Sequence, residues 1–239
     1  MLINLRDNRF IRFAFGWNYK SWSRAVKVSN FQPSNRIDRI LEIGSSRHSI
    51  VSIIFDGLAN EIVISYYLDE QREGIEQYLA SVRQKYDLKS KYVLEKVDAT
   101  SVEGSFDVVI MKSVLGGLFR QNSTHAFEVN EFIESLISRT VKTEGLLISI
   151  DNGKSILEPM LSRFGARKNQ WRFFGKSELK RAIIQSEFGV FSSFSFETRL
   201  GFVGYILDNY VIYFLDLILF KFLKHNPTVI FSVFKNHRQ

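Results

Sequence analysis

The stretch that decides the fold is residues 39–46, Arg39-Ile40-Leu41-Glu42-Ile43-Gly44-Ser45-Ser46. A short apolar run ends in an acidic residue, a glycine and two serines follow, and an amphipathic segment continues from Ile50 to Leu58. A strand, a turn of small residues and a helix in this order form a cradle for a ligand. The glycine lets the backbone come close to the ligand, and the start of the helix offers free N–H groups to a carboxylate or a phosphate.

Outside this stretch, short apolar runs alternate with segments of helical period as far as about residue 190. We expect strands at 39–43, 61–66, 92–97, 106–111, 145–150, 190–197 and 228–235. We expect helices at 47–58, 70–86, 126–141 and 176–187. This order predicts an α/β fold, a doubly wound, mainly parallel sheet of seven strands whose last strand is antiparallel. Ligands of such sheets bind where the strands end, which here means 42–48, 66–71, 98–100, 112–118 and 151–154.

The composition is that of a folded protein of 239 residues, 45% hydrophobic and 24% charged. This length suits one α/β domain or at most two small ones. The chain has no cysteine, which excludes disulfides, thiolate zinc sites and cysteine nucleophiles. No secretion signal is visible, and we expect a cytoplasmic protein, peripheral on the inner face of the membrane if it meets a membrane at all.

The positive charge is concentrated at the N-terminus. The net charge is +7, and residues 1–40 hold eight basic and two acidic residues among many aromatic ones. We therefore expect residues 1–35 to form a basic, aromatic helical cap on a domain that spans 36–239. Such a segment suits an anionic membrane surface or a phosphate-bearing substrate, or it simply covers the sheet. No recognition motif points to nucleic acid.

Residues 200–224 form a second unusual segment, LGFVGYILDNYVIYFLDLILFKFLK. The polar residues Asp208, Asn209, Asp216 and Lys221 interrupt it, so we expect an apolar helix over 202–223 rather than a transmembrane span. One broad face of that helix collects Leu207, Val211, Phe214, Leu215, Ile218 and Phe222. The domain core, a second copy in a homodimer, a lipid substrate or a bilayer surface must cover this face.

Four segments together resemble the class I methyltransferases that depend on S-adenosylmethionine (SAM), over roughly residues 36–197. They are LEIGSS (41–46), VDAT (97–100), GSFDVVIMKSVLGGL (104–118) and TEGLLISIDN (143–152). The resemblance implies a Rossmann-like methyltransferase fold with SAM as cofactor. A dinucleotide-binding domain is disfavoured, because its glycine-rich fingerprint is absent and its acid belongs at the end of the second strand.

The resemblance also implies roles for single residues. Glu42 would accept hydrogen bonds, directly or through water, from the cofactor's ammonium group, and Gly44, Ser45 and Ser46 would form the turn around its carboxylate. Asp98 would receive the adenine amino group beside the backbone of Ala99. The loop beside the methionine moiety would be Lys112, Ser113 and Val114.

Two departures from the family pattern leave another interpretation open. Ser46 and His48 stand where family members usually have glycines. Tyr66 stands where an acid usually holds the ribose hydroxyls, so that Asp69 or Gln71 would have to reach instead and Tyr66 would stack on adenine. A non-catalytic module, built on a degenerate methyltransferase fold and binding a membrane surface or a partner, is the alternative to an enzyme.

Two local resemblances concern the substrate. Residues 61–79 look like the small-amine N-methyltransferases that act on nicotinamide and phenylethanolamine. KSVLGG (112–117), Asp151-Asn152 and Trp171-Arg172-Phe173 are similar to methyltransferases of bacterial polysaccharide and cell-surface gene clusters. The acceptor would then be a hydroxyl or amine of a sugar, a lipid-linked glycan or another amphipathic small molecule.

Methyl transfer to a hydroxyl requires a base, and His125 and Asp151 are the candidates. Tyr19, Asn152, Trp171 and Arg172 are the candidates for contact with the substrate. We expect no metal, because the remaining histidines at 48, 225 and 237 lack a ligand spacing. Hydrolase chemistry is not indicated, because Ser45 and Ser46 do not form a nucleophile elbow.

Overall fold

The computed structural model describes residues 5, 7–33, 36–119, 128–154, 172–191, 196–223 and 227–237. Its helices and 3-10 turns are α1 (Asn8–Phe15), α2 (Tyr19–Val28), η1 (Val51–Phe55), α3 (Asp69–Arg83), α4 (Val114–Leu118), α5 (Val129–Thr140), η2 (Lys176–Glu178), α7 (Glu197–Ile206), the π-helical η3 (Leu207–Ile212) and α8 (Tyr213–Leu219). Its strands are β1 (Ile37–Ile43), β2 (Ala59–Tyr66), β3 (Lys91–Lys96), β4 (Phe106–Lys112), β5 (Val141–Asn152), β6 (Ile184–Phe188) and β7 (Val229–Lys235).

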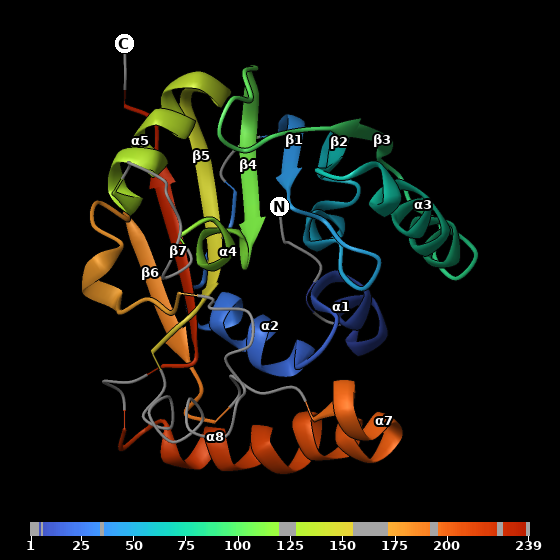
Figure 1. Ribbon diagram of the computed structural model, residues 1–239, viewed down its shortest axis with the longest axis vertical. Helices are drawn as coiled ribbons and strands as arrows, with labels where there is room; N and C mark the ends of the chain where they lie inside the picture. Colours follow the sequence, from blue (N-terminus) through green and yellow to red (C-terminus); the bar gives the residue numbers. More distant parts are fainter. Residues whose placement is uncertain are drawn as a thin grey trace.

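The strands form one sheet in the order β3-β2-β1-β4-β5-β7-β6. The first five are mutually parallel, and β7 runs antiparallel to both of its neighbours, β5 and β6. This confirms the predicted doubly wound sheet with an antiparallel last strand. The parallel strands all end at the same edge, which we call the carboxyl rim (Figure 1).

Helices cover both faces of the sheet, and each face has its own apolar core. On one face α1, α2, η1 and α3 pack against side chains such as Ile40, Ile62 and Ile110. On the other face α4 and α5 pack against Leu41, Val109 and their neighbours. Because both faces are buried, the central strands are continuous apolar runs without alternation.

The sixth strand and the helix before it were predicted wrongly. The pattern had indicated a helix over 176–187 and a strand over 190–197, whereas the structure has the short turn η2 and then β6 at Ile184–Phe188. Pairing decides this segment, because residues 184–188 hydrogen-bond to β7 from Val233 to Val229. The helical period of a short segment favours a helix only weakly. Here the complete set of hydrogen bonds to β7 outweighs it and makes the segment an edge strand.

The helix predicted over 47–58 is also reduced. The structure has a tight turn at Ser46–Ser49 followed by one 3-10 helix of five residues, η1. β-Branched residues fill this segment and lower its helix propensity, while Asp56 and Gly57 end it.

The apolar C-terminal helix exists and starts earlier than predicted. α7, η3 and α8 form one long rod with a kink at Gly201, near its start, where the backbone is not helical. The rod lies across the carboxyl rim, with α1 and α2 between the rod and the sheet (Figure 1). By length and composition the stretch Leu200–Leu219 could cross a membrane, and 22% of it is buried.

Candidate functional site

The sheet register gathers most of the predicted site residues at the carboxyl rim. Glu42 pairs with Ile64 of β2 and with Ile110 of β4, so the ends of these strands stand side by side. Lys112 ends β4 beside Ile150 of β5. The loops that follow β1, β2, β3, β4 and β5 therefore converge on one edge, as their sequence positions predicted.

Glu42 is buried, with 2% of its surface exposed. Its Oε1 accepts the N–H of Val51 at 2.9 Å, and its Oε2 accepts the N–H and the hydroxyl of Ser52 at 2.7 and 2.6 Å. Burial raises the pKa of Glu42, and the bonds from Ser52 and Val51 oppose that rise. Both oxygens thus hold the start of η1, and the predicted bond to a cofactor ammonium, directly or through water, stays a prediction.

The turn after β1 is tight and crowded. Gly44 has φ +78°, and a Cβ there would lie 2.6 Å from Cγ2 of Val114. Glycine is required at this position both for its left-handed backbone and for the close approach of the loop after β4. The hydroxyl of Ser45 is buried without a partner in hydrogen-bond geometry, although it lies near enough to Glu42 to lower that residue's pKa.

The bulky residues of this turn face the N-terminal helices. Ser46 bonds across the turn to Ser49, and the His48 ring lies 4.8 Å from the Trp17 ring. The turn between α1 and α2 touches the same loop, because a Cβ on Gly16 would lie 2.5 Å from the carbonyl oxygen of His48. The N-terminal segment therefore covers the turn from outside.

A partly buried cation lies at the centre of the rim. The Nζ of Lys112 is 4.6 Å from the centre of the Trp22 ring. Burial lowers the pKa of Lys112 to about 8, and the carboxylates of Glu42 and Asp151 act against that decrease. Sequence reasoning missed Trp22; the signal was its place among the aromatic residues interleaved with basic ones in residues 1–40.

Asp151 lies at the end of β5 and is fully buried. Burial raises its pKa to about 6 although Ser149, the backbone of Gly116 and Leu115, and Lys112 all favour the charged form. Its neighbour Asn152 donates to Ser113 Oγ at 3.3 Å. Ser113 has φ 57°, a left-handed conformation that turns the chain sharply after β4.

The ends of β2 and β3 carry the other predicted cofactor residues. Tyr66 is buried, and its hydroxyl interacts with Arg72. Asp69 pairs with Lys96, the last residue of β3, at 2.6 Å. Oδ1 of Asp98 accepts the N–H and the hydroxyl of Thr100 at 2.8 and 2.7 Å, and the side chain is partly exposed beside buried Ala99.

The remaining candidates are dispersed. His125 and Trp171 lie outside the described residues. Arg172 donates to Glu178 at 2.9 Å, and its backbone N–H bonds to the carbonyl of Gly116, close to the end of β5. Tyr19 is buried beside Tyr205 and Tyr210, in a groove whose lining also includes His48 of the turn after β1. Among the residues that the structure describes, no three His, Cys, Asp or Glu side chains could hold a metal ion.

Comparison with known proteins identifies the fold. No family model matches the chain, and no curated protein matches it. Among solved structures, the YcgJ protein of Bacillus subtilis has a TM-score of 0.52 at 14% identity, over 92% of this chain and 99% of that one. A Galdieria sulphuraria protein proposed to be a sarcosine dimethylglycine methyltransferase has a TM-score of 0.53 at 11% identity, over 92% and 85%.

A geranyl diphosphate methyltransferase, solved in complex with SAM, has a TM-score of 0.53 at 7% identity, over 90% of this chain and 85% of that one. Identities this low establish a shared fold and nothing finer. The chain has the Rossmann-like fold of the SAM-dependent methyltransferases.

Proposed function

We propose that this protein is a SAM-dependent methyltransferase. The observation that carries the proposal is the carboxyl rim, where the ends of three strands bring Gly44 (after β1), Asp98 (after β3) and Lys112 with Ser113 (at the end of β4) to one edge of a methyltransferase-type sheet. SAM brings an activated methyl group on a sulfonium, so the protein's task is to hold cofactor and acceptor in line.

The residues at the rim fit SAM at both of its ends. Both bonds from Thr100 go to Oδ1 of Asp98, and the side chain is partly exposed. Its Oδ2 would therefore accept a hydrogen bond from the adenine amino group. The ammonium of Lys112 would pair with the methionine carboxylate, near the buried Ser45 hydroxyl that lacks a hydrogen-bond partner. Glu42 would act through this assembly, by fixing η1 and by favouring the charged form of Lys112.

Asp151 is the base that the described residues offer for a hydroxyl acceptor. Its pKa of about 6 keeps it ionised at neutral pH while leaving it basic enough to take a proton. Ser149 donates to its Oδ2, while its buried Oδ1 has no hydrogen-bond partner among the described residues and is left to take the proton. His125 stays a prediction as the alternative base.

We propose a hydroxyl or amine of a sugar, a lipid-linked glycan or another amphipathic small molecule as the acceptor. Asn152 and Arg172 support a polar acceptor, because both are partly exposed close to the end of β5. The apolar rod beside the rim supports the amphipathic character. Contact of Trp171 with the acceptor stays a prediction.

A non-catalytic module is the second candidate, and specific observations favour it. Both oxygens of Glu42 are engaged by η1, and Val114 lies against Gly44. Tyr66 replaces the acid that would hold the ribose. A degenerate fold would keep the cradle's outline without room for the cofactor.

Ligand binding separates the two. SAM and S-adenosylhomocysteine should each raise the melting temperature of the intact protein, since a ligand of the folded state stabilises it. In calorimetry Asp98→Asn and Lys112→Gln should weaken SAM binding by roughly tenfold or more each, the loss of a hydrogen-bonded or charged contact. Asp87→Asn, an exposed change in the loop before β3, is the matched control. Absence of any shift with both ligands refutes the methyltransferase.

A further inference from the structure

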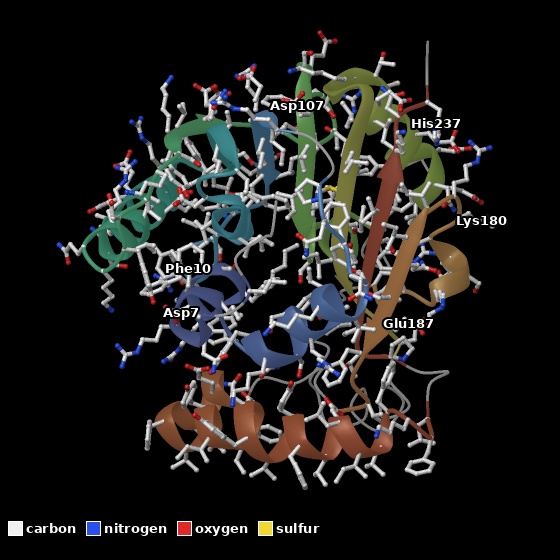
Figure 2. All side chains as sticks on the ribbon, turned by 180° about the vertical axis from the view of Figure 1, so that it is seen from behind. Asp7, Phe10, Asp107, Lys180, Glu187 and His237 are labelled. Carbon is white, nitrogen blue, oxygen red and sulfur yellow. The ribbon has the colours of Figure 1, made fainter. Side chains whose placement is uncertain are left out.

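The rod formed by α7, η3 and α8 exposes a continuous apolar face. Phe202 and Phe222 are 75% and 78% exposed, and most of the other large apolar side chains on this face are about half exposed. They are Leu200, Val203, Ile206, Tyr210, Val211, Phe214, Leu215 and Ile218. The face predicted from the sequence is thus the outward one, and the domain core does not cover it. Side chains along the rod project away from the rest of the molecule (Figure 2).

The two acids that interrupt this apolar run point inward. Asp208 accepts the N–H groups of Phe196 and Glu197, and Asp216 accepts those of Val190 and Phe191. Both side chains are buried. From Leu200 to Phe220 no other residue carries a charge, so the outward face is uncharged over the whole helical stretch that follows the kink, from Phe202 to Leu219, about 27 Å.

The π-helical segment helps to turn both acids inward. In a regular α-helix, eight positions leave two side chains about 80° apart around the axis. The π-helix η3, which contains Asp208, has more residues per turn than an α-helix, so each of its residues rotates the chain by a smaller angle around the axis. The angle between the Asp208 and Asp216 side chains is therefore smaller than in an α-helix, and both lie nearer to one face. The two acids that interrupt the apolar run therefore both lie on the inner face of the rod, and the outer face stays apolar.

Positive charge borders the apolar face. A groove of about 740 Å³ runs between the N-terminal helices and the rod, and its lining includes Arg9, Arg12 and Lys85. Its one carboxylate, Glu197, is already paired with Arg12 at 2.9 Å. Lys20 lies 3.7 Å from the centre of the Tyr210 ring, and Lys221 is exposed at the end of the rod.

We infer that the rod lies in the plane of an anionic lipid bilayer, with its apolar face among the acyl chains and the bordering cations at the phosphates. Apolar residues on one side and cations at the border are the features of an interfacial helix. A second copy of the chain fits less well, because a two-fold contact would bring the same cations together. A span across the bilayer would expose the buried Asp208 and Asp216.

Vesicle flotation of the full chain tests this inference and does not depend on methyl transfer. The protein should float with vesicles of phosphatidylcholine and phosphatidylglycerol, less with phosphatidylcholine alone, and be released by salt. Phe214→Glu should lower the bound fraction about tenfold or more, since it removes one large apolar contact and adds a charge. Ile183→Glu, at an apolar position that is 51% exposed against 61% for Phe214 and lies at the opposite end of the sheet, should change nothing.

A second pair of variants tests the cations that border the apolar face. Arg9→Glu should weaken binding to the anionic vesicles, whereas Lys180→Glu, far from the rod in Figure 2, should not. Because the chain has no cysteine, single cysteines can carry a spin label without background. Spin labels at Val203, Val211 and Ile218 should all lie at the same depth in the bilayer.

Label depths that increase steadily from one end of the rod to the other would contradict a rod that lies in the plane of the bilayer. Failure of the protein to float with either kind of vesicle would refute its binding to a lipid bilayer. Sedimentation as a dimer that Phe214→Glu dissociates, without flotation, would assign the face to a second copy instead.

Discussion

The ammonium nitrogen of Lys112 lies 4.6 Å from the centre of the Trp22 ring, so a helix of the N-terminal segment closes over the end of β4. The contact joins residues that are 90 positions apart in the sequence. It places a cation at the rim, close enough to the carboxylates of Glu42 and Asp151 for both to favour its charge. The proposed cofactor site is thus charged before any ligand arrives.

The low pKa of Lys112 should be visible in the stability of the protein. The folded state binds this proton less tightly than the unfolded state, whose lysine has a pKa near 10.5. The free energy of unfolding should therefore rise as pH increases from about 8 towards 10.5, the window in which the unfolded chain binds more protons. Because Lys20, Lys27 and Tyr86 also have shifted pKa values in both proteins, the measured quantity is the difference in the free energy of unfolding between the wild type and Lys112→Met, which should rise across this window in urea unfolding. Parallel curves would contradict it.

Asp151 should have the opposite signature. Its pKa of about 6 lies above the usual 3.8, so the folded state holds this proton more tightly. Its contribution to stability is complete below about pH 4 and is lost as pH rises through 6. Asp151→Asn should flatten the pH dependence of the urea midpoint between pH 4 and pH 7. If Asp151 is the base, methyl transfer by the wild type should also decline below about pH 6.

Glu42 should matter for the fold before it matters for a ligand. Glu42→Gln places an amide NH₂ against donors from Val51 and Ser52, which should destabilise the protein by about 1–3 kcal/mol. The matched control is Glu61→Gln on the neighbouring strand, whose partly exposed pairs with Arg39 and Lys91 contribute about 0–1 kcal/mol. Chemical denaturation measures both. Equal losses would show that the η1 bonds are not special.

Gly44 should resist substitution for two separable reasons. Gly44→Ala should lower stability by about 1–3 kcal/mol, since the residue has φ +78° and its new Cβ would meet Val114. Val114→Ala removes the side chain in the way but leaves the backbone strained. The double variant should therefore recover part of the loss and not all of it, which a double-mutant cycle measures. Full recovery would mean that the backbone costs nothing.

Much of the architecture was predictable because it follows from local patterns. Apolar runs with β-branched residues placed the strands of the parallel sheet to within a few residues, and their alternation with helices fixed the doubly wound topology. The outward face of the C-terminal helix followed in the same way from helical period. β6 was mispredicted because its ladder with β7, formed by residues more than 40 positions away, outweighs its own preference.

By itself, the sequence determined which residues reach the carboxyl rim, since each lies at the end of a strand and parallel strands end together. The tertiary structure alone decided what those residues touch. Glu42 binds the start of η1, Tyr66 turns to Arg72, and Lys112 lies under Trp22. Only the last of these pairs joins distant parts of the chain; the other two join a strand end to the element that follows it. In each case the side chain's partner is set by burial and by the nearest unpaired donor, neither of which a local pattern encodes.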